Sequence, residues 1–484
     1  MSTTAQLSAR ERILSLLDDN SFVEVGAMVT KRSTDFNMQQ KEIPADGVIT
    51  GYGVIDSNLV YVYSQDQTAL GGSVGEMHAK KIARIYDMAL KVGAPVIGLI
   101  DCAGLRLQEA TDALNGFGEL YLKQTLASGV IPQITAVLGN CGGGVAISSN
   151  LSDFTFMAEK DAKIFVNSPN ALDGNYMEKC DTSTAKFQAE AGVVDVVCED
   201  DEAVLASIRQ LVTILPSNYE DNDSYVECND DLNRLVPALG TYLKDSAIAL
   251  KEISDDNFFY EVKSAYSREM VTGFIRLNGM TIGAVANRAE ILDEELKAVE
   301  EFDGSLTTAG CEKATSFVNF CDAFNIPVLT LTSVKGYKAT TEEEKTIAKA
   351  AAKLTYAFAN ATVPKVNVIV GEAYGSAYVT MNSKHIGADL VLAYEDAIIG
   401  MMDAKSAAQI MYAEEINACS DATSMIDEKT REYASLQSSV EAAAKRGYVD
   451  NIISTEATRK QLVYAYEMLF TKRDSRPSKK HGTV

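Results

Sequence analysis

The strongest constraint on the fold is an internal repeat, in which Gly and Pro residues recur at one constant separation. Pro327 follows Pro95 by 232 residues (327 − 95 = 232), in the similar contexts NIPVLTLT and GAPVIGLI. Four further pairs share this separation: Gly104 and Gly336, Pro132 and Pro364, Gly139 and Gly371, Gly143 and Gly375. Upstream, ITGYGVIDSNLVYVY from Ile49 resembles VTGFIRLNGMTIGAV from Val271 at a separation of 222 (271 − 49 = 222). The chain is therefore predicted to contain two copies of one domain.

Each copy has the pattern of an α/β domain. In the first copy, residues 47–66 alternate apolar and polar residues around an Asp-Ser-Asn turn, which predicts a β-hairpin. GEMHAKKIARIYDMALKVG has helical periodicity and ends at Gly93, and apolar strands, a second helix and the glycine turn CGGG follow. The acidic stretch 216–240 is weakly periodic and is predicted to connect the copies, giving domains 1–240 and 241–484.

Composition excludes several classes of protein. Lys and Arg number 44 against 67 Asp and Glu, and the net charge of −23 disfavours nucleic-acid binding. Apolar stretches such as residues 94–100 are too short to span a bilayer, and the first residues lack a signal-peptide core, so we expect a soluble cytoplasmic protein. The 8 Cys form no C-x-x-C pair and only 3 His are present, so neither a metal site nor a Ser-His-Asp triad is expected.

The glycine turns are the candidate functional sites. Glycine lets the backbone approach a ligand closely, and N–H groups converging at such a turn can stabilise an oxyanion. Each copy has two such places at the ends of successive strands: Gly104–Leu105 and Gly143–Gly144, then Gly336–Tyr337 and Gly375–Ser376. Two related sites suggest transfer of a group between two activated carbonyls, although the same glycines can serve only tight turns or helix–sheet packing. Neither turn fits G-x-x-x-x-G-K-[ST] or G-x-G-x-x-G, which disfavours a phosphate-binding loop.

Several motifs resemble the biotin-dependent acyl-CoA carboxyltransferases. In the first half they are SQDQTALGGSVGEMHAKKI, KVGAPVIGLID and ASGVIPQITAVLGNCGGG. In the second half they are FCDAFNIPVLTLTSVKGY, ATVPKVNVIVGEAYGSAY and AAKRGYVDNIIS. The similarity covers nearly the whole chain in the same order. It implies a tandem repeat of two crotonase-like (ββα spiral) domains, as in propionyl-CoA carboxylase β subunits and the carboxyltransferase subunits of methylmalonyl-CoA and glutaconyl-CoA decarboxylases.

The resemblance also implies a division of labour between the copies. The first domain would hold acyl-CoA, and the second domain of a partner subunit would hold biotin, within a homo-hexamer. The thioester enolate oxygen would be held by Gly104, Leu105, Gly143 and Gly144. The ureido oxygen of biotin would be held by Gly336, Tyr337, Gly375, Ser376 and Ala377. Arg106 would help to bind an anionic group of the substrate, and Val379 stands near the acyl pocket where family members typically carry Asp.

The chain has no Ala-Met-Lys-Met-like attachment site, so biotin would arrive on a separate carboxyl carrier protein. The first hypothesis is a carboxyltransferase subunit that moves CO2 between this biotin and a methylmalonyl- or propionyl-CoA-like substrate. Its setting would be a sodium-pumping decarboxylase with a membrane subunit. One alternative is the β subunit of an ATP-dependent acyl-CoA carboxylase, which works with a biotin carboxylase subunit. Two others are a biotin-independent crotonase-type acyl-CoA hydratase or hydrolase and a non-catalytic assembly scaffold.

Overall fold

The computed structural model describes residues 6–32, 43–173, 180–221 and 225–477. The chain divides into two compact units, residues 1–224 and 225–484, and each is described by itself. The division falls inside the acidic stretch 216–240 that the composition predicts as a connector. Among the described residues, no helix combines the length and the apolar character needed to cross a membrane.

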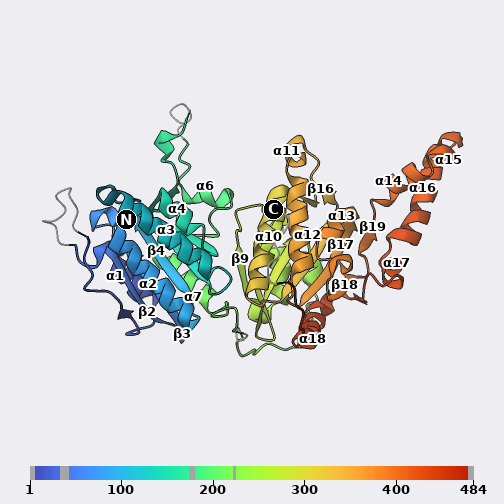
Figure 1. Cartoon of the computed structure of the whole chain (residues 1–484). Helices are drawn as coiled ribbons and strands as arrows, with labels where there is room; N and C mark the ends of the chain where they lie inside the picture. Colours follow the sequence, from blue (N-terminus) through green and yellow to red (C-terminus); the bar gives the residue numbers. More distant parts are fainter. Residues whose placement is uncertain (1–5, 33–42, 174–179, 222–224, 478–484) are drawn as a thin grey trace. The chain divides into compact units, whose positions relative to one another are not determined.

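The first unit is built on one mixed sheet in the order β1-β2-β3-β4-β5-β6-β8, with β7 also paired to β5. Strands β2, β3 and β4 of this sheet are labelled in Figure 1. The pairs β1–β2 and β2–β3 are antiparallel, and all the other pairs are parallel. The strands are β1 (Val23–Glu24), β2 (Val48–Ile55), β3 (Asn58–Gln65), β4 (Val96–Cys102), β5 (Gln133–Gly142), β6 (Phe154–Ala158), β7 (Lys163–Phe165) and β8 (Val196–Cys198). The helices are α1 (Ala9–Leu16), α2 (Glu76–Val92), α3 (Ala110–Ala127), α4 (Gly144–Ser149), α6 (Ala185–Glu190) and α7 (Asp201–Val212).

The second unit repeats this sheet in the order β9-β10-β11-β15-β17-β18-β20, with β19 paired to β17. Its strands are β9 (Phe259–Val262), β10 (Met270–Leu277), β11 (Met280–Asn287), β15 (Val328–Val334), β17 (Lys365–Tyr374), β18 (Leu390–Tyr394), β19 (Ile398–Gly400) and β20 (Asn451–Ile453). Two small sheets pair β12 (Glu290–Leu292) with β13 (Ala298–Glu301) and β14 (Ser305–Leu306) with β16 (Gly336–Tyr337).

The helices of the second unit cover the sheet and extend beyond it. They are α8 (Leu239–Tyr242), α9 (Ser246–Ile253), α10 (Thr308–Ala323), α11 (Thr341–Glu344), α12 (Ile347–Asn360), α13 (Gly375–Thr380), α14 (Ala404–Met411), α15 (Ala413–Ala418), α16 (Ala422–Tyr433), α17 (Val440–Lys445) and α18 (Thr458–Leu469). Its core joins sheet residues such as Val368 and Leu392 to Leu250 of α9 and Leu462 of α18. Helices α14 to α16 follow β19, where the first unit has no described counterpart, and α16 buries none of its side chains.

The predicted repeat and the predicted local elements are confirmed. The β2–β3 hairpin turns through Asp56 and Ser57, both of which have positive φ, and α2 ends on Gly93 in the left-handed conformation. A pair of buried lysines is also repeated. Lys81 of α2 donates to the Ala45 carbonyl at 2.9 Å, and Lys313 of α10 donates to the Tyr266 carbonyl at 2.8 Å. Each lysine thereby fixes the segment that leads into the hairpin of its own unit.

Candidate active site

In the first unit, the two predicted glycine turns meet at the carboxyl ends of adjacent parallel strands. β4 and β5 pair in parallel, with a register shift between Ile100 and Cys102 that places Cys102 opposite Cys141, and each strand then enters its glycine turn. Gly104 has φ +113°, and a Cβ added there would lie 3.3 Å from the Gly142 carbonyl oxygen. Gly143 has φ +61°, and a Cβ added there would meet open space. The backbone conformation at both positions therefore favours glycine, and the fold brings the predicted first-unit loops together.

The backbone hydrogen bonds of these loops leave two N–H groups available. Val74 N–H donates to the Gly104 carbonyl at 2.9 Å, and Arg106 N–H donates to the Val74 carbonyl at 3.0 Å. Leu105 lies between these two bonds, and Gly144 opens α4, where a first-turn N–H has no acceptor in the helix. Within the described residues, neither the Leu105 nor the Gly144 N–H has an acceptor. These two donors are what an oxyanion site requires.

Two thiols lie beside the turns but are poor nucleophiles. Cys102 and Cys141 are fully buried, and burial raises the pKa of each to about 12. The Cys102 sulfur accepts a hydrogen bond from Gly104 N–H at 3.3 Å. Both thiols therefore stay protonated near neutral pH, and their contribution is to pack and shape the loop.

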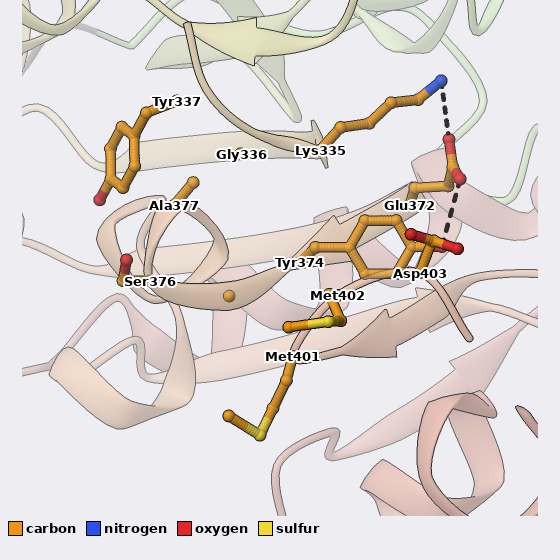
Figure 2. Close-up of a pocket in the computed structure, with 11 residues that line it drawn as sticks. Lys335, Gly336, Tyr337, Glu372, Tyr374, Ser376, Ala377, Met401, Met402 and Asp403 are labelled. Carbon is orange, nitrogen blue, oxygen red and sulfur yellow. Dashed lines mark hydrogen bonds and ion pairs between the residues drawn. The ribbon is translucent and has the colours of Figure 1, made fainter. Parts of the chain in front are cut away.

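In the second unit, the predicted residues line one cavity of about 390 Å³ (Figure 2). All five lie in its wall: Gly336, Tyr337, Gly375, Ser376 and Ala377. Gly375 begins α13 with φ +60°, and a Cβ there would lie 3.2 Å from the Met401 carbonyl oxygen. Gly336 has φ +152°, and a Cβ there would meet open space. The arrangement matches that of the first unit, since both turns again follow adjacent parallel strands.

Five further residues line this cavity that the sequence reasoning did not single out: Glu372, Tyr374, Met401, Met402 and Asp403. Lys335, also in the wall, pairs with Glu372 at 3.0 Å, and the Tyr374 hydroxyl donates to Glu372 at 3.2 Å (Figure 2). Burial, assisted by the Glu372 charge, raises the pKa of Tyr374 to about 12. Glu372 and Tyr374 belong to the repeated GEAYGS motif, so the internal repeat could have identified them as candidates. Met401, Met402 and Asp403 follow β19, and the internal repeat does not identify them.

Tyr337 is held against the cavity wall by a chain of hydroxyl groups. Its hydroxyl lies 3.1 Å from that of Thr380, which in turn lies 3.1 Å from that of Thr355. Asp403 accepts hydrogen bonds from the Lys405 and Ser406 N–H groups at the start of α14. The Ser406 side chain, together with these N–H groups, lowers the pKa of the Asp403 carboxyl. The cavity therefore combines apolar side chains with carboxylates that are already engaged.

The environment of Arg106 differs from the ligand-binding role that the sequence predicts. The Arg106 side chain is 0% exposed and lies between Asp46 and Glu109, which leaves it no surface for a substrate anion. Val379 lies in α13, where its carbonyl accepts a hydrogen bond from Ser383, and its place near the acyl pocket stays a prediction. The described residues also contain no group of three or more His, Cys, Asp or Glu able to hold a metal ion.

Comparison with known proteins gives the family. The carboxyl transferase domain family matches residues 3–484. The chain is 38% identical to the methylmalonyl-CoA decarboxylase subunit alpha of Propionigenium modestum, over 99% of this chain and 93% of that one. It is 39% identical to the propionyl-CoA carboxylase beta chain of Roseobacter denitrificans, over 99% and 94%.

A crystal structure of transcarboxylase 12S, a hexamer with hydrolysed methylmalonyl-coenzyme A bound, superposes with a TM-score of 0.90. It is 36% identical in sequence, and the alignment covers 99% of this chain and 92% of that one. This likeness confirms the tandem crotonase-like fold that the motifs predicted. The chain therefore belongs to the carboxyl transferase family, and its reaction is carboxyl transfer.

Proposed function

We propose that this protein transfers a carboxyl group between a short-chain acyl-CoA and biotin held on a separate carrier protein. The observation that carries the proposal is the repetition of one glycine-turn site in both units. Carboxyl transfer develops negative charge on two oxygens, that of the thioester enolate and that of the ureido ring, so it needs two oxyanion sites. A single-site hydratase or hydrolase needs only one, and a scaffold has no use for unpaired N–H groups at strand ends.

The first unit would bind the acyl-CoA, with the Leu105 and Gly144 N–H groups directed at the thioester oxygen. Gly104 and Gly143 give the backbone the positive φ that this loop conformation requires. Two donors present before the reaction stabilise the enolate without reorganising, which is worth a few kcal/mol for each donor. Removal of the carboxyl group from the α-carbon leaves the electron pair that this oxygen accepts.

The second-unit cavity fits the ureido ring of biotin better than it fits a coenzyme A. Its wall contains the apolar groups of Ala377, Met401 and Met402, which suit a neutral bicyclic ring. Its one lysine is already paired with Glu372, and Asp403 adds a further negative charge, which disfavours phosphate groups. When bound, biotin supplies the ureido nitrogen that carries the carboxyl group. The Tyr337, Ser376 and Ala377 N–H groups would be the donors to its ureido oxygen.

The physiological setting is the finer part of the proposal. We place the protein in a biotin-dependent sodium-pumping decarboxylase, as a cytoplasmic homo-hexamer that works with a biotin carboxyl carrier protein and a membrane subunit. The relative from Propionigenium modestum, a decarboxylase subunit, supports this direction. The second candidate is the β subunit of an ATP-dependent acyl-CoA carboxylase, which the propionyl-CoA carboxylase relative favours.

The test is a decarboxylation screen with the purified protein. Malonyl-, methylmalonyl- and glutaconyl-CoA are each incubated with and without a high concentration of free biotin, and release of CO2 is followed. Biotin-dependent loss of CO2 from one substrate supports the proposal and identifies the acyl group. Turnover that is independent of biotin would contradict the two-site proposal and favour a single-site enzyme.

A further inference from the structure

A buried ion cluster lies directly behind the proposed enolate-binding loop of the first unit. The Arg106 guanidinium donates to Asp46 at 2.6 Å and to Glu109 at 2.8 Å. All three side chains are 0% exposed. The residue that follows Leu105 in the chain is thus fixed by two carboxylates in the interior. Ion pairs enclosed in this way hold one geometry, because any movement would leave a charge unpaired away from water.

The same two carboxylates cap helix α2. Glu109 accepts a hydrogen bond from the Glu76 N–H at 2.6 Å, and Asp46 accepts one from the His78 N–H at 2.8 Å. The N-cap residue, Gly75, has no side chain with which to do this. A Cβ at Gly75 would lie 2.5 Å from Arg106 Nη1, so only glycine leaves room for the cluster. The first turn of a 17-residue helix is therefore tied to the loop through Arg106.

Arg106 also holds the opposite side of the loop. Its Nη2 donates to the Ser73 carbonyl at 2.7 Å, one residue before Val74. Val74 in turn makes the two backbone hydrogen bonds that flank Leu105. The direction of the Leu105 N–H is thus set by a segment that the Arg106 side chain clamps. Nothing in this arrangement requires Arg106 to touch the substrate.

The second unit has the corresponding backbone hydrogen bond, but the ion pair at the position that corresponds to Arg106 is exposed rather than buried. Lys338 stands 232 residues after Arg106 (338 − 106 = 232), and its N–H donates to the Leu306 carbonyl at 2.9 Å. Its side chain, however, pairs with Asp303 at the surface, where the two side chains are 41% and 55% exposed. The first-unit loop is held by buried ion pairs, whereas the corresponding loop of the second unit has a solvated one.

We propose that Arg106, Asp46 and Glu109 are positioning residues, which fix the Leu105 N–H for the thioester oxygen without contacting it. The expected effect on the rate of decarboxylation rests on the proposed function, whereas the expected effect on the rigidity of the loop does not. The reaction at the first unit needs a donor whose direction is fixed before the substrate binds. A displacement of the order of 1 Å at such a donor costs on the order of a hundredfold in rate.

The test compares Arg106→Met and the milder Glu109→Gln with Lys338→Met, the matched change in the other unit. Hydrogen exchange is measured on the full-length protein without substrate. Both first-unit variants are expected to raise exchange in residues 103–109 and in the first turn of α2, and Lys338→Met is expected to change neither. Glu109→Gln keeps one acceptor and the side-chain shape, so it serves if Arg106→Met fails to fold.

Kinetics give the second readout. In biotin-dependent decarboxylation, folded first-unit variants are expected to lose about tenfold to a hundredfold in kcat, with KM for free biotin unchanged. Unchanged exchange in residues 103–109, or a kcat within twofold of the parent, would overturn the inference. Absence of biotin-dependent turnover in the parent protein would instead contradict the proposed function, and the exchange result would still decide whether the cluster holds the loop.

Discussion

Replacement of Gly143 by Ala is expected to lower both the stability of the protein and its kcat, and the two effects can be measured separately. Gly143 has φ +61° and ψ −125°, a combination open essentially to glycine, so a side chain there costs roughly 1–3 kcal/mol of stability. A unit of this size loses about 2–4 °C of Tm for each kcal/mol. The added methyl group meets no atom within 4 Å and instead enters the open space where the thioester is proposed to bind. Obstruction of one oxyanion donor is expected to lower kcat by roughly 10²- to 10³-fold.

The assay is biotin-dependent release of CO2 from the acyl-CoA that the screen identifies, with Tm measured on the same preparations. Gly447→Ala is the matched control, because Gly447 has φ +78°, an added Cβ there also meets open space, and it lies after α17. The control should lose stability and keep its kcat. A Gly143→Ala protein that loses stability but keeps the parent kcat would refute the oxyanion role of this turn.

Three further outcomes are expected. In the folded protein, burial, assisted by the Arg106 charge, lowers the pKa of His78 from 6.5 to about 3. Between pH 6.5 and pH 3, His78 is therefore protonated in the unfolded chain but neutral in the folded protein. The contribution of His78 to the free energy of unfolding should therefore fall as the pH drops below 6.5, by about 2 kcal/mol at pH 5. Burial raises the pKa of Asp153 to about 7 and acts in the opposite direction, so the measurement is a comparison with His78→Gln. In urea unfolding, the parent should lose about 2 kcal/mol more than His78→Gln between pH 7 and pH 5. Gly375→Val should raise KM for free biotin without changing KM for the acyl-CoA, because the added valine side chain crowds the Met401 carbonyl in the second-unit cavity. An equal rise in both KM values would contradict the assignment of the two sites. Arg12→Met should cost about 3–5 kcal/mol in urea unfolding, since it leaves Asp101 buried without its cation, and a loss below about 1 kcal/mol would count against that ion pair.

The sequence alone was enough to predict the architecture. A constant separation of 232 residues between Gly104 and Gly336 and between Gly143 and Gly375 indicated two copies of one domain, and both copies have the same strand order. Glycine and proline carried this signal because their backbone requirements resist substitution after the side chains around them have changed. The hairpin and the end of α2 at Gly93 were predictable for the same local reason.

Tertiary structure decided which charged groups belong to the site. Arg106 stands next to Leu105 in the sequence and looks available to a ligand, yet its partners Asp46 and Glu109 enclose it completely. Asp46 lies 60 residues away, so no local pattern connects it with Arg106. Met401 and Asp403 likewise reach the second-unit cavity only because β19 pairs with β17 beside the glycine turn. A sequence determines where the backbone must turn, whereas burial and ion pairing depend on contacts that form only when distant segments pack together.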